Sequence, residues 1–426
     1  MKKRSLADWL DYQQRIHPRS IELGLERVAE VWRRMGELRP APIVITVGGT
    51  NGKGSTVAFL EAMLAVDGKR TGAYTSPHLL RYNERVRVAG ADVGDAALVD
   101  AFERIEAARA EIALTYFEFG TLAALWIFVQ SGIDIALLEV GLGGRLDAVN
   151  IIDADATAVT SIDLDHQDWL GNDRDSIGRE KAGIFRAGRP AIIGADEPPQ
   201  GLLDEADRIG ADVLRAGSDF RVLRGESGWQ WRSAGTLVDL PWPSLVAPCQ
   251  IDNAAAAIMA LHALRDRLGW NPRALVDGVR DARIAARLQR LPIPGQAEVI
   301  VDVAHNPQAA RVLAQWLASN PAAGHTLAVF GALDDKDVAG IVAPLQSQVD
   351  AWLLAALDSL SPRGLAAAPL QARVHAAVPS VAASTHGDPR AALAAARSQA
   401  RPGDRIVAFG SFYVAAEVLA AMDARG

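Results

Sequence analysis

A glycine-rich loop with one lysine, GGTNGKGST at residues 48–56, lies between a short apolar run and a helical pattern. Glycines allow backbone N–H groups to turn toward an anion, and the N-terminus of the following helix adds a partial positive charge. Lys53 would supply a mobile cation for the β- and γ-phosphates of a nucleotide. An ordinary turn between a strand and a helix would also use glycines, but the TNGKGST run favours a nucleotide site.

The loop departs from the strict phosphate-binding motif at two positions. Val47 stands where that motif has its first glycine, and Gly54 stands where it has a Ser or Thr directly after the lysine. The hydroxyls arrive late, as Ser55 and Thr56. A hydroxyl that binds a metal ion must therefore come from another segment.

A polar segment at residues 75–90, TSPHLLRYNERVRVAG, offers such a hydroxyl in Ser76. It also carries Arg81, Arg85 and Arg87, whose forked donors match the geometry of carboxylates and phosphates. A solvated surface loop would have a similar composition, so this segment is a candidate site only in combination with the others.

Glu139 ends an apolar run within LLEVGLGGRLDAVN, residues 137–150. A buried carboxylate is costly unless it meets a cation or hydrogen-bond donors. A structural salt bridge or a metal ion would satisfy that requirement. The glycines that follow Glu139 allow a ligand to approach the backbone closely.

Three aspartates and a histidine lie at the end of another apolar run, in SIDLDHQDWLG, residues 161–171. They are Asp163, Asp165, His166 and Asp168. Oxygen ligands suit Mg²⁺, whereas histidine is more typical of zinc or iron sites. Since a phosphate loop is present, we favour Mg²⁺ bound together with a nucleotide, near His166. A helix N-cap or a structural histidine would also explain the segment.

Lys181 lies in REKAGIF, on a predicted helix just after this acidic segment. Most lysines on helices are exposed. If Lys181 is instead buried beside the metal, the loss of solvation lowers its pKa and favours the neutral amine.

A further polar group ends an apolar run in VIVDVAHNPQAA, residues 299–310. Asp302 could hold a ribose hydroxyl, and His305 could contact a phosphate or assist proton transfer. An ordinary capped start of a helix would explain the same residues.

Strands that alternate with helices must position these segments, because ligands bind at the carboxyl ends of strands in open α/β sheets. Apolar runs of strand length predict a mostly parallel sheet in the first part of the chain. Residues 212–245 change to short runs separated by glycine, which predicts a small antiparallel sheet. The expected strands of the main sheet are 43–48, 134–140, 157–162 and 190–194.

A second domain follows a proline-containing linker at residues 290–297, RLPIPGQA. The first domain, residues 1–289, is expected to be a P-loop-type α/β domain that binds ATP. Residues 298–426 are expected to form a smaller, Rossmann-like α/β domain, with strands near 298–303, 325–330, 351–356 and 405–410. Two domains agree with the length of 426 residues.

Composition excludes several classes of partner. The net charge of −7 gives no global attraction to nucleic acid or to an anionic membrane. The most membrane-like run, residues 119–133, is shorter than the roughly 20 residues that span a bilayer. Cys249 is the only cysteine, which fits a reducing compartment, and no signal peptide develops after MKKRS. We expect a cytoplasmic protein that is a monomer.

Taken together, the motifs resemble those of the folylpolyglutamate synthase and dihydrofolate synthase family, relatives of the Mur peptide ligases. GTNGKGST, TSPHLLRYNERVRV, EVGLGGRLDAVN, DHQDWLG, REKAGIF and DVAHNP occur in the order typical of that family. The series spans nearly the whole chain and is far more specific than any one motif. The SPHLLRYNERV segment is similar to the form found in bacterial bifunctional enzymes. Near the linker, AARLQR departs from the Pro-Gly-Arg-Phe-Gln-like sequence usual in the family.

The resemblance implies roles for residues that match the family's motifs. Lys181 matches a lysine that CO₂ converts into a carbamate near the metal. The implied ATP contacts are Gly52, Lys53, Gly54, Ser55, Asn253, Arg287 and Asp302. The implied Mg²⁺ ligands, direct or through water, are Ser76, Glu139 and His166. The implied pterin or folate contacts are Arg81, Thr115, Tyr116, Phe117, Glu118, Leu146, Asp147 and Ala148.

The implied activity is ATP-dependent amide ligation through an acyl phosphate. L-Glutamate would be added to dihydropteroate and to the γ-carboxylate of reduced folates, with His305 near the acyl phosphate or the incoming amine. A monovalent cation could also be required. Two alternatives stay open: a related ligase with a non-folate acceptor, and a nucleotide-binding module that has lost catalysis.

Overall fold

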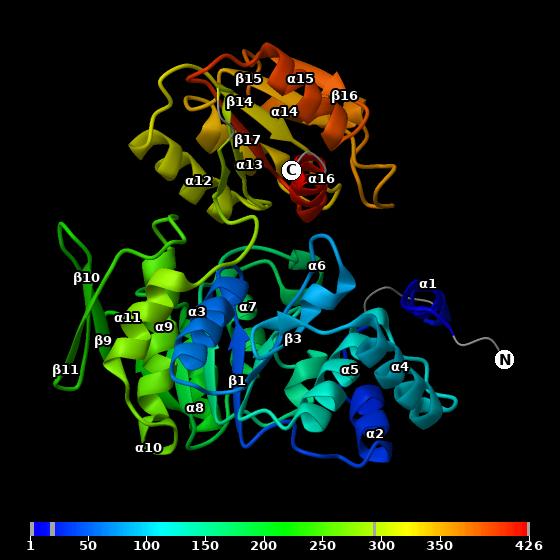
Figure 1. Cartoon of the computed structure of the whole chain (residues 1–426), viewed down its shortest axis with the longest axis vertical. Helices are drawn as coiled ribbons and strands as arrows, with labels where there is room; N and C mark the ends of the chain where they lie inside the picture. The colour runs from blue at the N-terminus through cyan, green and yellow to red at the C-terminus, as the bar shows by residue number, and fades with distance from the viewer. Residues whose placement is uncertain (1–3, 18–21, 293–294, 424–426) are drawn as a thin grey trace. The chain divides into compact units, whose positions relative to one another are not determined.

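The computed structural model describes residues 4–17, 22–292 and 295–423 (Figure 1). The chain forms two compact units. The first comprises residues up to Ser244 together with Gln250–Arg283, and the second comprises Leu245–Cys249 together with the residues from Ile284 onward.

The first unit is built on an eight-stranded sheet with the order β4-β3-β2-β5-β1-β6-β7-β8 among the described residues. All neighbouring strands from β2 to β8 are parallel, whereas β3 and β4 form an antiparallel edge. The strands are β1 (Ile43–Gly48), β2 (Thr71–Tyr74), β3 (Val86–Val88), β4 (Ala91–Asp92), β5 (Ile135–Glu139), β6 (Ala156–Val159), β7 (Pro190–Ile193) and β8 (Asp212–Arg215). The central strand β1 is buried along its whole length, as an apolar run in a covered parallel sheet predicts.

Helices on the sheet complete the first core. They are α1 (Leu6–Ile16), α2 (Glu26–Arg34), α3 (Lys53–Val66), α4 (Asp95–Arg109), α5 (Tyr116–Ser131), α6 (Gln167–Leu170), α7 (Arg174–Ala182), α8 (Gln200–Ile209), α9 (Gln250–Ala263), α10 (Arg265–Leu268) and α11 (Pro272–Asp281). Helix α3 packs on β1, β2 and β5, and α9 packs on α3, β6 and β7. The uncharged run that resembles a membrane segment is the buried helix α5, which starts at a Thr115 capping box and ends at Gly132 in the left-handed conformation.

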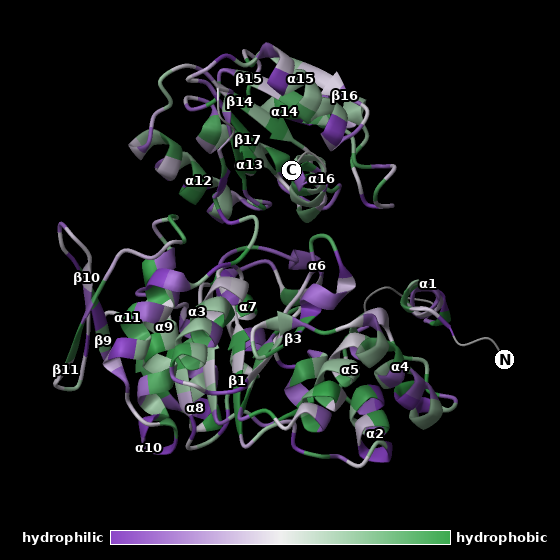
Figure 2. Ribbon diagram, in the orientation of Figure 1, coloured by the Kyte–Doolittle hydropathy of each residue, from purple (hydrophilic) through white to green (hydrophobic). Residues whose placement is uncertain are grey.

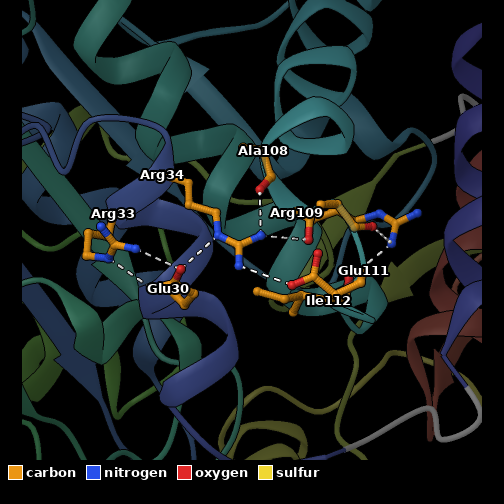
Figure 3. A network of polar contacts seen from close by, with 8 residues as sticks. Glu30, Arg33, Arg34, Ala108, Arg109, Glu111 and Ile112 are labelled. Carbon is orange, nitrogen blue, oxygen red and sulfur yellow. Dashed lines mark hydrogen bonds and ion pairs between the residues drawn. The ribbon is translucent and has the colours of Figure 1, made fainter.

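Arg34 joins α2 to the C-terminal end of α4 and to the loop just after it (Figure 3). Its Nε donates to Glu30 at 2.7 Å, and its Nη1 donates to the carbonyl oxygens of Ala108 and Arg109 at 3.3 Å. The Nη2 atom pairs with Glu111 at 3.2 Å. This exposed network closes a helix end whose last carbonyls would otherwise face solvent.

The antiparallel sheet predicted within residues 212–245 is present but shorter. It consists of β9 (Phe220–Arg224), β10 (Trp229–Ser233) and β11 (Thr236–Leu240). Its first expected residues instead form β8, which continues the main sheet parallel to β7.

The second unit contains a six-stranded sheet, in the order β12-β13-β17-β14-β15-β16 among the described residues. Its strands are β12 (Gln289–Leu291), β13 (Glu298–Val301), β14 (Thr326–Phe330), β15 (Ala351–Ala355), β16 (Ala383–His386) and β17 (Arg405–Phe409). Its helices are α12 (Pro307–Ser319), α13 (Val338–Val342), α14 (Ala367–Ala377), α15 (Pro389–Gln399) and α16 (Phe412–Asp423), with a short 3-10 turn at Ala343–Leu345. The interior strands of both units are hydrophobic (Figure 2).

The boundary between the units differs from the predicted linker. The compact units divide the chain at Arg283 and Ile284, ahead of the predicted boundary at residue 289. Residues Gln289–Leu291 form β12, which pairs antiparallel with β13 and so belongs to the second sheet. Pro292 directly follows β12, which lies at the edge of the described sheet, where proline is tolerated. Residues 293 and 294 of the expected linker lie outside the described residues.

No helix among the described residues is long and apolar enough to cross a membrane.

Candidate active site

The glycine-rich loop joins the end of β1 to the start of α3, as predicted, and it is closely packed. Gly49 has a φ of 139°, and a Cβ at this position would lie 2.0 Å from Oγ1 of Thr160. Gly52, which precedes α3, has a φ of 90°, and its Cβ would lie 2.3 Å from Oδ1 of Asn253. Only glycine fits both positions, since the backbone angle and the space each exclude a larger residue.

Asn253 of α9 therefore contacts the phosphate loop itself. Its Nδ2 donates to Oε1 of Gln250 at 3.0 Å, which fixes the orientation of the amide beside Gly52. The structure thus places Asn253, which the family resemblance implied as an ATP contact, beside the phosphate loop.

Two lysines meet at one carbonyl oxygen of the loop. Nζ of Lys53 donates to the carbonyl oxygens of Gly49 at 3.0 Å and Thr50 at 3.1 Å. Nζ of Lys181, which comes from α7, donates to the same Gly49 oxygen at 2.9 Å. The charge of Lys53 and the glycine N–H groups form an anion-attracting site, to which Lys181 adds when its amine is protonated.

Lys181 is buried, with 4% of its surface exposed. Burial and, to a lesser extent, the positive charge of Lys53 lower the pKa of its amine to about 7, against the opposing effect of Asp165 and Asp147. Its position on a helix alone would favour an exposed lysine. The packing of the folded unit buries it instead. With this pKa about half of the amine is neutral at pH 7, and the neutral amine is the form that reacts with CO₂.

Two hydroxyl groups at the start of α3 are buried next to the loop. Oγ of Ser55 and Oγ1 of Thr56 make no hydrogen bond to any described residue. Buried hydroxyls nearly always have a partner in native proteins. An oxygen-rich ligand such as a nucleotide phosphate would provide one, so the loop fits the phosphate that its sequence predicted.

Glu139 lies at the end of β5, directly beside β1 in the sheet, where its Cα is paired with that of Val47. Its side chain is 5% exposed, and its Oε2 accepts the backbone N–H of Ser76 at 3.1 Å. The structure thus joins two of the three residues expected at a metal ion. A carboxylate next to a phosphate site and a serine suits Mg²⁺, which usually takes one or two protein ligands in addition to phosphate and water.

His166, the third expected metal ligand, follows β6. It has a φ of 51° and is the N-cap residue of the short helix α6, and its Nε2 lies 4.0 Å from Oδ1 of Asp165. Within the described ranges, no group of three His, Cys, Asp or Glu residues is arranged to hold a metal ion. Protein side chains alone would therefore make an incomplete cage, in agreement with a divalent ion that shares its coordination with a nucleotide.

The segment before His166 is tied to the phosphate loop by backbone contacts. The backbone N–H of Thr50 donates to the carbonyl oxygen of Ser161 at 2.7 Å, and Oγ1 of Thr50 donates to that of Asp163 at 3.1 Å. Oγ1 of Thr160 donates to the carbonyl oxygen of Asn51 at 2.6 Å. These bonds join the loop after β1 to the segment after β6.

The residues expected to bind the pterin divide into two kinds. Thr115 and Glu118 form the capping box of α5, in which Oε2 of Glu118 accepts the backbone N–H of Thr115 at 2.7 Å. Both are buried and structural. Tyr116 and Phe117 are partly exposed, and Phe117 packs on Tyr74 with ring centroids 5.9 Å apart.

Asp147 shapes the glycine-rich loop that follows β5. It is 3% exposed, and its carboxylate accepts the backbone N–H groups of Leu142 at 2.8 Å and Val149 at 3.1 Å. Burial raises its pKa to about 6, although these bonds and the charge of Lys53 oppose the shift. Leu146 is partly exposed beside it, whereas Ala148 is buried.

Arg81 points away from this group. Its side chain is 68% exposed and pairs with Asp95 at 3.0 Å. The structure does not bring Arg81 to the other predicted pterin residues, because Asp95 at the start of α4 holds it in solvent.

In the second unit, Asp302 follows β13. Its two oxygens accept the backbone N–H groups of Ala304 at 2.7 Å and Leu288 at 2.8 Å, and burial raises its pKa although the charge of Arg287 opposes the shift. The guanidinium of Arg287 lies 5.7 Å from the ring centroid of Phe412, and the ring of His305 lies 5.9 Å from it. These three predicted residues therefore gather within the second unit.

Sequence reasoning missed Arg27, which follows a part of the chain that carried no motif. Its guanidinium donates to Glu22 at 2.7 Å and to Glu118 at 3.1 Å, so it fixes the start of α5 on which Tyr116 and Phe117 stand. An arginine in the first turn of a predicted helix is ordinary, and no local signal marks this one.

Two family models match the chain: the Mur ligase middle domain at residues 47–261 and the Mur ligase, glutamate ligase domain at residues 286–412. The dihydrofolate synthase/folylpolyglutamate synthase of Escherichia coli K12 is 46% identical over 99% of this chain and 96% of that protein. E. coli FolC in complex with DHPP and ADP superposes with a TM-score of 0.92 at 45% identity, covering 99% of this chain and 98% of that one. A bifunctional folylpolyglutamate synthase/dihydrofolate synthase with Mn, AMPPNP and L-glutamate bound gives a TM-score of 0.90 at 44% identity, with the same coverage.

These matches confirm the predicted α/β fold class and the resemblance drawn from the motifs. The chain therefore belongs to the dihydrofolate synthase/folylpolyglutamate synthase family of Mur ligases and is an ATP-dependent ligase.

Proposed function

We propose that this enzyme adds L-glutamate both to dihydropteroate and to the γ-carboxylate of reduced folates, using ATP to activate the acceptor. The observation that carries the proposal is the meeting of Lys53 and Lys181 at the Gly49 carbonyl, next to Glu139 and the phosphate loop. Its relatives named above have been solved with ADP, AMPPNP, L-glutamate or DHPP bound.

ATP binding is assigned to the phosphate loop. Gly52, Gly54 and Ser55 would bind phosphate oxygens, and Lys53 would leave its present carbonyl partners to neutralise the transferred phosphoryl group. Asn253 would bind the nucleotide from α9, next to Gly52. We also propose ATP contacts for Arg287 and Asp302 and a contact with the acyl phosphate or the amine for His305.

A divalent metal, Mg²⁺ in our proposal, would be held by Ser76, Glu139 and His166. When bound, it supplies positive charge to the phosphate oxygens. Glu139 is pre-oriented for this role by the N–H of Ser76. Carbamylation of the neutral amine would make Lys181 an anion, so that it would repel the carboxylates and attract Lys53.

The proposed reaction has two steps. An oxygen of the acceptor carboxylate attacks the γ-phosphorus of ATP, the bond to the β,γ-bridging oxygen breaks, and ADP leaves. The amino nitrogen of L-glutamate then attacks the acyl carbon, loses a proton, and displaces phosphate that retains the acceptor's oxygen. The chain's residues contribute mainly by positioning and by neutralising charge, since phosphoryl transfer leaves little covalent work for side chains.

The acceptor would lie between the start of α5 and the loop after β5. Phe117 offers a partly exposed ring on which a pterin can stack, Tyr116 beside it would line the rest of the acceptor site, and Asp147 holds the opposite loop. Thr115, Glu118 and Ala148 would act through backbone groups and packing rather than through free side chains.

Phosphate release tests the proposal. Purified enzyme should release phosphate only when ATP, Mg²⁺, L-glutamate and one of the two acceptors are all present. Release with dihydropteroate and with tetrahydrofolate supports bifunctionality. No release with either acceptor would refute the folate assignment and favour a Mur-type ligase with another acceptor.

Three further proposals need their own measurements. A cytoplasmic location is tested by cell fractionation, and a monomeric state by sedimentation velocity. A requirement for a monovalent cation is tested by replacing K⁺ with tetramethylammonium in the assay.

A further inference from the structure

Arg85 is a buried arginine without an acidic partner among the described residues. It ends the short 3-10 helix Tyr82–Arg85 between β2 and β3, and 9% of its surface is exposed. Its Nε donates to Nδ1 of His78 at 2.8 Å, whereas its two Nη nitrogens donate no hydrogen bond within the described part of the chain. Its guanidinium carbon lies 5.4 Å from the ring centroid of Tyr82 and 5.6 Å from that of Tyr116.

The nearby carboxylates are already occupied by other groups. Glu84 accepts three backbone N–H groups of its own loop, at 2.6 to 2.7 Å, and Asp95 pairs with Arg81. Glu118 is bound by Arg27 and by the helix cap, and Asp147 by two backbone N–H groups. None of these acidic groups forms an ion pair with Arg85.

A mostly buried arginine loses much of its hydration, and the two Nη nitrogens of Arg85, which are not among the fully buried polar atoms, are left to bind an anion that enters from solvent. The rings of Tyr82 and Tyr116 and the nitrogen of His78 hold the guanidinium in place but do not neutralise it. Nδ1 of His78 accepts from Nε of Arg85 at 2.8 Å, which fixes the orientation of the guanidinium plane. The pre-oriented fork of Arg85 is therefore suited to a bidentate carboxylate.

Arg85 also lies close to the proposed reaction centre. Its backbone oxygen accepts the N–H of Thr75 at 2.9 Å, and Thr75 precedes Ser76, which binds Glu139. Tyr116, one of its two aromatic neighbours, belongs to the proposed acceptor site. A carboxylate bound by Arg85 would thus belong to a molecule that enters that site.

The two acceptors of the proposed reaction differ in one carboxylate. Dihydropteroate carries a single carboxylate, which is the one that reacts. A reduced folate carries a second one, the α-carboxylate of its terminal glutamate, which does not react but must be accommodated beside the reacting γ-carboxylate. We propose that Arg85 binds this α-carboxylate and so is a specificity residue for polyglutamylation, an inference that rests on the proposed function. His78 would be the residue that positions the Arg85 guanidinium.

The test compares Arg85→Gln, Arg85→Lys and His78→Ala with wild type, using both acceptors. Arg33→Gln is the matched control, because Arg33 is an exposed arginine on α2, paired with Glu30. We expect Arg85→Gln to lower kcat/KM for tetrahydrofolate about 10- to 100-fold, the usual loss for a hydrogen-bonded charged contact, and to change the value for dihydropteroate less than about threefold. Arg85→Lys should recover part of the loss, and His78→Ala should raise the KM for tetrahydrofolate with little change in kcat.

Three outcomes would overturn the proposal. Equal losses with both acceptors would make Arg85 a structural residue or a ligand of a shared group. A raised KM for L-glutamate with both acceptors would place the incoming amino acid there instead. Unchanged kinetics with tetrahydrofolate would leave Arg85 without this role.

A measurement on the wild-type enzyme covers the case in which the variants fail to fold. Tetrahydrofolate whose α-carboxylate is converted to the amide should be about 10- to 100-fold poorer than tetrahydrofolate, since the neutral amide loses the charged contact. An equally good amide substrate would overturn the proposal. Turnover of dihydropteroate by the same preparation separates this result from a failure of the proposed function.

Discussion

Replacement of Lys181 by methionine should remove a pH dependence of stability that the buried amine creates. The pKa of Lys181 falls from 10.5 to about 7 on folding, with burial as the main cause. At pH 7 about half of these side chains are then neutral in the folded protein, against about one in 3000 for a solvated lysine. Methionine has a similar length, carries no charge and suits a buried position.

The sign follows from the protons bound in each state. Between pH 7 and pH 9 the unfolded chain keeps the Lys181 proton, whereas the folded chain loses it. Stability therefore rises with pH in this window: the cost of burying the charged amine is full below about pH 7, falls as pH rises above 7, and is gone only near pH 10.5, where the unfolded chain also loses the proton. The expected gain from pH 7 to pH 9 is about 2 kcal/mol in the free energy of unfolding, and Lys181→Met should lack it.

Urea unfolding at pH 7, 8 and 9 measures this difference. Buffers should be free of CO₂, because a carbamate would replace the titrating amine by an anion. Intrinsic fluorescence and circular dichroism should be followed together, so that the transition of the first unit is separated from that of the second. The reasoning is refuted if wild type and Lys181→Met gain stability by the same amount between pH 7 and pH 9.

Further predictions concern the phosphate loop and the metal. Lys53→Ala should abolish phosphate release without changing the urea midpoint, and near-normal turnover would contradict its role. Gly49→Ala would place a methyl group 2.0 Å from Oγ1 of Thr160 and should remove the rise in Tm that AMPPNP causes; Gly94→Ala, in open space, should retain that rise. Glu139→Gln should shift the Mg²⁺ concentration for half-maximal activity upward about tenfold or more, because one charged ligand is lost, and an unchanged Mg²⁺ titration would count against Glu139 as a ligand.

Much of the main sheet could be predicted from sequence because its parallel strands are buried on both faces and read as apolar runs. β1 and β5 were expected at nearly their observed positions for this reason. β2, with the sequence TGAY, is short and contains no such run, so it was not expected. β12 was mistaken for linker because prolines follow it, although its three residues pair with β13.

The candidate site could be predicted as a set of residue types but not as a set of contacts. The glycines and Lys53 predicted a phosphate loop because they form a local sequence motif. That Lys181 shares the Gly49 carbonyl with Lys53 depends on how the tertiary fold places α7 beside the loop after β1, which no local pattern encodes. Arg81 and Arg85 look equivalent in the sequence, yet one is paired with Asp95 in solvent and the other is buried beside His78.

The central claim, ligation through an acyl phosphate of the acceptor, is tested most directly by isotope transfer. Dihydropteroate labelled with ¹⁸O in its carboxylate is incubated with the enzyme, ATP, Mg²⁺ and L-glutamate, and the released phosphate is analysed by mass spectrometry. The reaction described above predicts one ¹⁸O atom in each phosphate formed. Unlabelled phosphate, released together with the amide product, would contradict it.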